Sequence, residues 1–263
     1  MKLSGQETLT KHMKPQYKFI EKPNLPTGEV STVAISADAE KAIKMLNKMN
    51  VETVLISKNS ALPKPVQSHA DLQLLHLKNN KVLICNEHLF LGESEKKIDI
   101  ILSRCVLGSK YPEDVPLNCK IIGKHIILNS RTISKEILDF AKNEQLTVID
   151  VNQGYSGCSV CALDENTIIT DDPSIYAAAQ NFLNDTLLIE KGSIRLEGYG
   201  YGFIGGCCGK IAENKLAVNG RIESHSDYKR IIDLCEQKKI EIVELSDEAL
   251  TDIGGILPLT ERI

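Results

Sequence analysis

The sequence predicts an α/β protein that forms a five-bladed propeller in a single domain. Three observations lead to this fold: one short pattern recurs five times, each copy alternates strands with a helix, and the copies leave over only a short N-terminal arm. Strands that alternate with helices are typical of α/β architectures. We therefore expect one domain over residues 1–263, in which residues 1–28 are the arm.

The recurring pattern is an apolar strand that ends in a small or polar turn. Consecutive copies begin 49, 44, 42 and 48 residues apart. Self-similarity at a period of this length is the signature of repeat architectures. The copies read TVAISADA from Thr32, KVLICNEH from Lys81, HIILNSRT from His125, TIITDDPS from Thr167 and KLAVNGRI from Lys215.

Each copy continues with a helix, a second strand and a hairpin. Helical spacing predicts helices over 39–49, 134–144, 173–184 and 225–238, with a weaker one over 88–100. Second strands are predicted over 52–57, 99–105, 146–151, 186–191 and 240–245. Tight polar turns then join a third strand to the next copy, which predicts hairpins over 72–85, 119–129, 159–170 and 209–218.

A unit of this size cannot bury both a sheet and a helix by itself. Closure into a ring gives every unit two neighbours and leaves no open sheet edge. The expected molecule is a ring of five ββαβ-type units about a pseudo-fivefold axis, with the helices outside. Equivalent loops should then converge on one central pocket, which is the default place to look for a site.

Composition excludes several classes of partner. The net charge of −4 comes without a basic run, so we expect no nucleic acid. No apolar stretch approaches the roughly 18 residues of a membrane span, and the N-terminus lacks the apolar core of a signal peptide. We expect a cytoplasmic protein whose eight cysteines are thiols, with a small-molecule substrate as partner.

Polar and thiol side chains lie at the ends of four of the five loops that precede the third strands. The fifth loop offers only Gly254 and Gly255. In the first loop, a histidine and an aspartate two residues apart point to the same side of an extended chain. The residues are His69 and Asp71, then Cys119, then Cys158 and Cys161, then Cys207 and Cys208.

Five ββαβ-type units in a chain of this length resemble the pentein fold of the guanidino-group-modifying enzymes. That superfamily includes arginine deiminase, the amidinotransferases and agmatine deiminase. The resemblance implies a cysteine nucleophile, a histidine acid/base and carboxylates that hold the guanidinium. His69-Ala70-Asp71 matches the superfamily's H-x-D pattern. The resemblance therefore implies a hydrolase or amidinotransferase in which His69 and Asp71 are catalytic and Asp71 also binds substrate.

The chain departs from the superfamily in the position of the nucleophile. H-x-D usually lies in the fourth unit and the cysteine in the last, but here H-x-D is in the first unit and Pro258 occupies the expected cysteine position. If the order of units is circularly permuted, Cys119 becomes the candidate nucleophile. Cys207 and Cys208, which follow a Gly-Gly pair, are its rivals. Each of these thiols is equally explained as a small core residue.

The glycine-rich segment after residue 193 supplies further candidates. Glu197 is a second carboxylate for substrate binding, and Tyr199, Tyr201 and Phe203 suit a cover over the pocket.

Two other functions stay open. A ring with a filled axis and buried cysteines would suit a non-catalytic binding module, as in translation initiation factor 6. Four cysteines in neighbouring loops would suit a tetrahedral metal site; these are Cys158, Cys161, Cys207 and Cys208. For the enzyme we expect no cofactor. The substrate, the oligomeric state and the identity of the nucleophile are left undecided.

Overall fold

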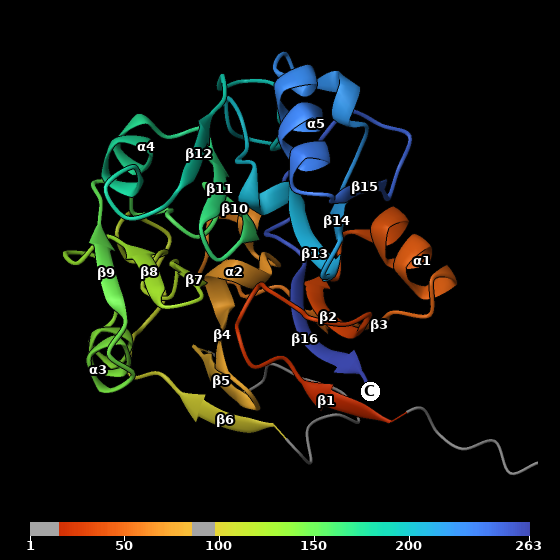
Figure 1. The fold of residues 1–263 in the computed structure, drawn as a ribbon. Helices are drawn as coiled ribbons and strands as arrows, with labels where there is room; N and C mark the ends of the chain where they lie inside the picture. Colours follow the sequence, from red (N-terminus) through yellow and green to blue (C-terminus); the bar gives the residue numbers. More distant parts are fainter. Residues whose placement is uncertain (1–15, 86–97) are drawn as a thin grey trace, which may run out of the picture.

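The computed structural model describes residues 16–85 and 98–263, and within them the strands form five separate sheets (Figure 1). Four sheets have three strands each, and the fifth has four. The mixed α/β class predicted from the sequence is confirmed. Within the described residues, no helix has the length and hydropathy needed to cross a lipid bilayer.

The three-stranded sheets share one topology. In each, the first two strands form an antiparallel hairpin, and the third strand pairs with the middle one in parallel. The sheets are β4 (Leu74–Lys78), β5 (Lys81–Ile84) and β6 (Asp99–Leu102); β7 (Lys120–Ile122), β8 (His125–Leu128) and β9 (Thr147–Asp150); β10 (Val160–Asp164), β11 (Thr167–Thr170) and β12 (Asp185–Leu188); and β13 (Cys208–Ala212), β14 (Lys215–Val218) and β15 (Glu241–Glu244).

The remaining sheet joins the two ends of the chain. Its order is β1 (Tyr17–Phe19), β16 (Leu257–Arg262), β2 (Val30–Ser36) and β3 (Glu52–Ile56). The C-terminal strand β16 takes the hairpin position, antiparallel to β2. Part of the expected N-terminal arm is therefore a strand, because β1 extends this sheet by pairing with β16.

Each of the five recurring sequence stretches forms the strand that pairs antiparallel with one neighbour and parallel with the other. They are β2, β5, β8, β11 and β14. These strands are buried on nearly every residue, which explains why they read as continuous apolar runs rather than as alternating patterns.

The longer helices lie on the outside of the molecule (Figure 1). Four of the five predicted helices are confirmed, and the weaker prediction over 88–100 lies largely outside the described residues. A four-residue helix near the centre, α2 (Ala70–Gln73), was not predicted. The peripheral helices are α1 (Glu40–Lys48), α3 (Lys135–Asn143), α4 (Pro173–Ala179) and α5 (Tyr228–Gln237).

Apolar side chains fill the space between neighbouring sheets. One cluster packs α5 and the β13–β14 hairpin against the β10–β11 hairpin, and another packs α4 against β8 and β10. The segments that lead into the hairpins therefore meet where the sheets come together.

Candidate active site

Hydrogen bonds link the five segments that precede the innermost strands into a closed cycle. The Asp71 amide donates to Gly254 O (3.1 Å), and the Asn118 amide nitrogen donates to Asp71 O (3.1 Å). Asn118 Oδ1 accepts from the Cys158 amide (3.1 Å). Cys158 O accepts from the Gly206 amide (3.0 Å), and Gly206 O accepts from Gly255 N (2.8 Å). Residues from all five loops thus surround one point.

A cavity of about 200 Å³ opens beside this cycle. Its polar lining comes from a histidine, a cysteine, an aspartate and three tyrosines, and the rest is apolar. The lining residues are Val66, His69, Leu72, Tyr155, Cys158, Leu196, Tyr199, Gly200, Tyr201, Phe203 and Asp252.

Asn118 and Asp71 hold the Cys158 thiol in place. The Asn118 side chain accepts from the amides of Gly157 (2.7 Å) and Cys158 (3.1 Å), and its nitrogen donates to Cys158 Sγ (3.0 Å). The thiol donates to Asp71 Oδ2 at 2.7 Å. The thiol is therefore fixed between an amide donor and a carboxylate acceptor.

The surroundings of Cys158 favour the neutral thiol. Burial raises the pKa of Cys158 well above its usual value, and the carboxylates of Asp71 and Asp252 raise it further. Only the Asn118 hydrogen bond to the sulfur acts in the opposite direction. Forming the thiolate here requires compensating positive charge.

Asp71 keeps one oxygen unpaired. Its side chain is 8% exposed, and Oδ1 has no hydrogen-bond partner within the described residues. An unpaired buried carboxylate oxygen costs free energy. Asp71 is not among the residues that line the cavity, and its link to the cavity is the hydrogen bond that it accepts from Cys158.

Asp252 is a second carboxylate at the cavity. It accepts from the amides of Phe203 (2.9 Å) and Gly254 (2.9 Å), and its Oδ1 lies 3.8 Å from His69 Nδ1. Burial, and then the charge of Asp71, raise the pKa of Asp252 against the opposing effect of His69. Asp252 and His69 thus form a pair on one wall of the cavity.

Glycines allow the loops to approach this closely. Gly254 has φ +76°, and a side chain there would collide with His69. A side chain at Gly206 would collide with the Asp252 carboxylate. The two Gly-Gly pairs therefore make room for the polar groups of the site.

Aromatic rings form the outer wall of the cavity. The rings of Tyr155 and Phe203 stack with centroids 5.8 Å apart, and Tyr201 meets Phe203 edge-on at 5.7 Å. The Tyr155 hydroxyl donates to the buried Asp114 carboxylate, which fixes the ring. Tyr199, Tyr201 and Phe203 thus line the cavity, where the sequence predicted a cover.

The structure brings His69, Asp71 and Cys158 together but places the candidate nucleophile Cys119 elsewhere. Cys119 packs in a core cluster with Leu117 and Ile121, and burial raises its pKa to about 12. Asn118, the residue before it, faces Cys158 instead. Adjacent residues of an extended chain point to opposite sides.

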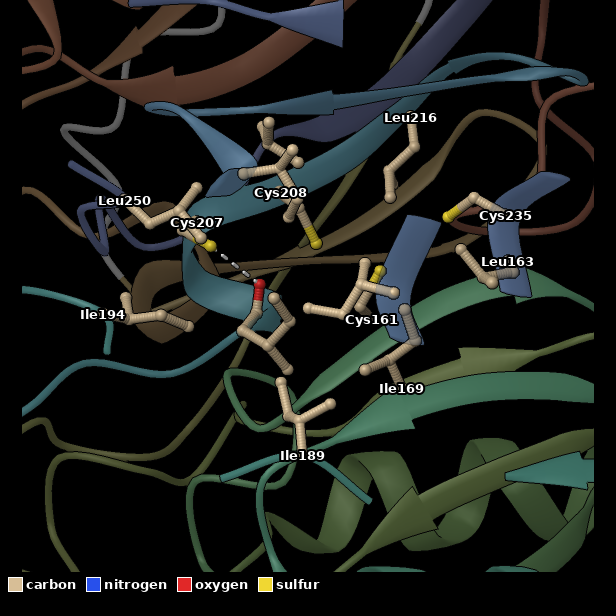
Figure 2. Close-up of a cluster of buried hydrophobic side chains, with 14 of the residues drawn as sticks. Cys161, Leu163, Ile169, Ile189, Ile194, Cys207, Cys208, Leu216, Cys235 and Leu250 are labelled. Atoms are coloured by element: carbon tan, nitrogen blue, oxygen red, sulfur yellow. Dashed lines mark hydrogen bonds between the residues drawn. The ribbon is translucent and has the colours of Figure 1, made fainter. Parts of the chain in front are cut away.

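The rival cysteines also lie in the core. Figure 2 shows Cys207 and Cys208 among apolar side chains such as Leu216 and Leu250. The Cys207 thiol donates to Ile204 O at 3.2 Å, and burial raises its pKa well above the usual value. Neither thiol lines the cavity.

Glu197 and most of the proposed metal ligands do not line the cavity either. Glu197 is exposed and does not line the cavity, although its neighbour Leu196 does. Cys161 lies with Cys207 and Cys208 in the core cluster, apart from the cavity wall where Cys158 lies. In the described part of the chain, no group of three or more His, Cys, Asp or Glu side chains is arranged to hold a metal ion.

Sequence reasoning missed two contributors to the site, Asn118 and Asp252, and it named Cys158 only as one of several thiols at the converging loops. The signal available in the sequence was the distance of each residue from the start of the hairpin strand that follows it. Asn118, Cys158 and Gly206 each lie two residues before the first residue of a hairpin strand, whereas Cys119 and Cys207 lie one residue before it. Strand boundaries to a single residue were needed to see this.

Residues 34–257 match the model of the family of unknown function DUF6873. No curated protein matches the chain in sequence. Among solved structures, inosamine-phosphate amidinotransferase StrB1 of Streptomyces griseus is similar with a TM-score of 0.58 at 11% identity, over 90% of this chain and 94% of that chain. The amidinotransferase SxtG of Microseira wollei gives a TM-score of 0.54 at 10% identity, over 92% and 96%.

Agmatine deiminase of C. jejuni gives a TM-score of 0.52 at 12% identity, over 91% of this chain and 93% of that chain. Likenesses at such low identity concern the fold. All three are members of the superfamily that the sequence resembles. The chain therefore belongs to the family of unknown function DUF6873 and has the fold of the pentein superfamily.

Proposed function

We propose that the protein is a cysteine-dependent enzyme that acts on the guanidinium or amidine group of a small molecule, with Cys158 as nucleophile. One observation carries the proposal: the Cys158 thiol lines a cavity together with His69 and Asp252, and donates to Asp71 at 2.7 Å. The five sheets are then five blades about the axis at which these groups meet, as in the superfamily. The amidinotransferases and the deiminase that share the fold support this class of reaction.

The charges of the site suit a cation. The buried carboxylate of Asp252 lines the cavity, and the buried carboxylate of Asp71 accepts from the Cys158 thiol. Among the lining residues in the described chain there is no lysine or arginine. Asp71 Oδ1 is an open acceptor for an N–H group of a guanidinium. The aromatic rings of Tyr155 and Phe203 would favour a cation beside their faces.

A bound cation would favour formation of the Cys158 thiolate. Positive charge next to Cys158 lowers the thiol pKa that burial and the two carboxylates raise. The thiol proton passes to Asp71, its present hydrogen-bond acceptor, and the thiolate attacks the central carbon of the amidinium. His69, beside Asp252, donates a proton to the leaving amine. Water or a second amine then releases the amidino group from Cys158.

The remaining walls indicate what the rest of the substrate is like. Leu72, Leu196 and Phe203 are apolar, and the described lining residues include no lysine or arginine to receive a carboxylate. We propose that the substrate is an alkyl- or arylalkyl-guanidine rather than a guanidino acid. Turnover of an alkylguanidine at least tenfold faster than that of arginine is the expected comparison.

Alkylation by 2-chloroacetamidine, a cationic mimic of an amidinium, tests the proposal. Mass spectrometry of the labelled protein should find Cys158 modified first, faster than a free thiol, and protected by added guanidinium salts. Cys158→Ser should abolish this label, whereas Cys119→Ala and Cys207→Ala should retain it. Labelling that proceeds no faster than that of a free thiol, or that falls first on another cysteine, would overturn the assignment.

A further inference from the structure

A second pair of thiols lies away from the active site. Cys85 directly follows β5, and Cys105 lies three residues after β6. β5 and β6 are parallel, with Ile84 opposite Leu102, so their ends bring the two cysteines side by side. The two sulfur atoms are 2.8 Å apart. A disulfide of about 2.05 Å needs less than 1 Å of further approach.

The pair is chemically polarised. Ser103 Oγ donates to Cys105 Sγ at 3.1 Å and itself accepts from the Cys105 amide at 3.2 Å. The hydrogen bond shared with Cys85 lowers the pKa of Cys105 to about 7, and the same bond raises the pKa of Cys85. These effects favour ionisation of Cys105 and oppose ionisation of Cys85.

Access also separates this pair from the other cysteines. Cys85 and Cys105 are partly exposed, whereas the remaining six cysteines are buried. An accessible thiolate beside a second thiol is the arrangement found in redox-sensing cysteine pairs, in which the second thiol resolves the oxidised first one.

We propose that Cys85 and Cys105 form a redox-active dithiol site at which a hydroperoxide closes a reversible disulfide. The Cys105 thiolate attacks one oxygen of hydrogen peroxide, the O–O bond breaks, and the departing hydroxide takes a proton to become water. The Cys85 sulfur then attacks the Cys105 sulfenic acid while the Cys85 thiol proton passes to the departing hydroxide, the S–O bond breaks, and a second water leaves. Two thiols are oxidised by two electrons while the peroxide is reduced to two waters.

The test is peroxide treatment of the full-length protein, followed by blocking with N-ethylmaleimide, trypsin digestion and mass spectrometry. Trypsin cuts after Arg104, so the disulfide appears as two peptides joined through Cys85 and Cys105, and dithiothreitol separates them. Cys119→Ala, which removes a core thiol, should still form this link. Recovery of both Cys85 and Cys105 as maleimide adducts, or preferential oxidation of another cysteine, would overturn the proposal.

Cys85→Ala provides a second, independent measurement. Without the Cys85 hydrogen bond, alkylation of Cys105 by iodoacetamide at pH 6 should slow by about tenfold or more, because less of the thiolate is present. Peroxide should then leave Cys105 as a sulfenic acid that dimedone traps. An unchanged alkylation rate would contradict the assigned polarity. Neither measurement involves Cys158, so this site and the proposed amidine chemistry succeed or fail separately.

Discussion

At the scale of single residues, the proposed nucleophile lies in surroundings that oppose its reactive form. A thiol with a usual pKa of about 8.5 is buried against two carboxylates, and all of these effects raise its pKa. With its pKa raised in this way, the Cys158 thiol should react slowly with neutral electrophiles. Since only a cation reverses the balance, reactivity itself would select for amidinium groups.

Asp71→Asn should change the reactivity of Cys158 in opposite directions for neutral and cationic reagents. Loss of the neighbouring negative charge lowers the thiol pKa, so alkylation by neutral iodoacetamide at pH 8 should rise several-fold. Loss of the carboxylate also removes the acceptor for an amidinium, so alkylation by 2-chloroacetamidine should fall about tenfold or more. Rates from pH 6 to 10 measure both effects.

The matched control is Asp139→Asn, on the exposed side of α3, which should leave both rates unchanged. If Asp71→Asn moved both rates in the same direction, Asp71 would not have the two roles assigned to it.

At the scale of elements, turns and helix ends position the site. Helix α4 begins with Asp172, whose carboxylate accepts from the amides of Ser174 (2.8 Å) and Ile175 (3.1 Å), and Pro173 is the first helical residue. This agrees with the helix start predicted from the sequence. The glycine turn before β16 contributes in a different way, because it allows the backbone to lie close to His69.

Asp172→Ala should lower the free energy of unfolding by about 1 kcal/mol, as expected for loss of an N-cap. Burial raises the pKa of Asp172, but hydrogen bonds from Ser174 and Ile175 outweigh it and leave the pKa lowered. The contribution is therefore present above the usual aspartate pKa of about 3.9 and is lost as the pH falls below it.

Urea unfolding at pH 7 and pH 3 measures the effect of Asp172→Ala. Ser134→Ala, at the start of α3, is the control, since Ser134 makes no side-chain cap bond and its substitution should lose no capping energy. An equal loss in the two variants would contradict the capping role.

Gly254→Ala should disrupt the site. The residue needs a positive φ, and its new side chain would meet His69, so the free energy of unfolding should fall by about 1–2 kcal/mol or more. Labelling by 2-chloroacetamidine should slow at least tenfold, because His69 and Asp252 must move. Gly28→Ala is the control: Gly28 does not line the cavity, its φ is not positive, and a side chain there would come no closer than 3.4 Å to its neighbours. Equal labelling rates in both variants would argue against a closely packed site.

At the scale of the whole molecule, the fold concentrates buried negative charge around its centre. Four aspartates are buried near the converging loops, and several keep an oxygen without a partner within the described residues. The four are Asp71, Asp114, Asp171 and Asp252. Burial raises the pKa of Asp171 and of Asp252, so stability should depend on pH.

Asp171 gives the clearest pH prediction. Burial raises its pKa to about 7, so between pH 4 and pH 7 the folded protein binds a proton that the unfolded chain has released. Its contribution to stability therefore decreases as the pH rises through this window. In Asp171→Asn, the decrease in the free energy of unfolding from pH 5 to pH 8 should be smaller than in the unmodified protein.

Urea unfolding at the two pH values measures this difference. Asp233→Asn, at an exposed position on α5, should retain the pH dependence of the unmodified protein. An Asp171→Asn variant with the same pH dependence would show that another group is responsible.

Much of the fold could be predicted from the sequence because its causes are local. Strands buried on all sides read as apolar runs, helices show their own spacing, and polar turns mark the hairpins. These features led to the α/β class, to four of the peripheral helices and to loops that converge. The H-x-D pattern pointed to His69 and Asp71, both of which the structure places at the cavity or against Cys158.

Only the tertiary structure decided which thiol faces the cavity. Neighbouring residues of an extended chain point to opposite sides. An error of one residue in a strand boundary therefore assigns a core side chain to the cavity and a cavity side chain to the core. β10 and β13 contain bulges, whereas β7 does not. A bulge changes the number of residues between the hairpin turn and the preceding loop, so Cys158 and Cys119 could not be aligned from the sequence. Asp252 was equally hidden, because its place opposite His69 depends on β16 returning from the C-terminus to pair with β2.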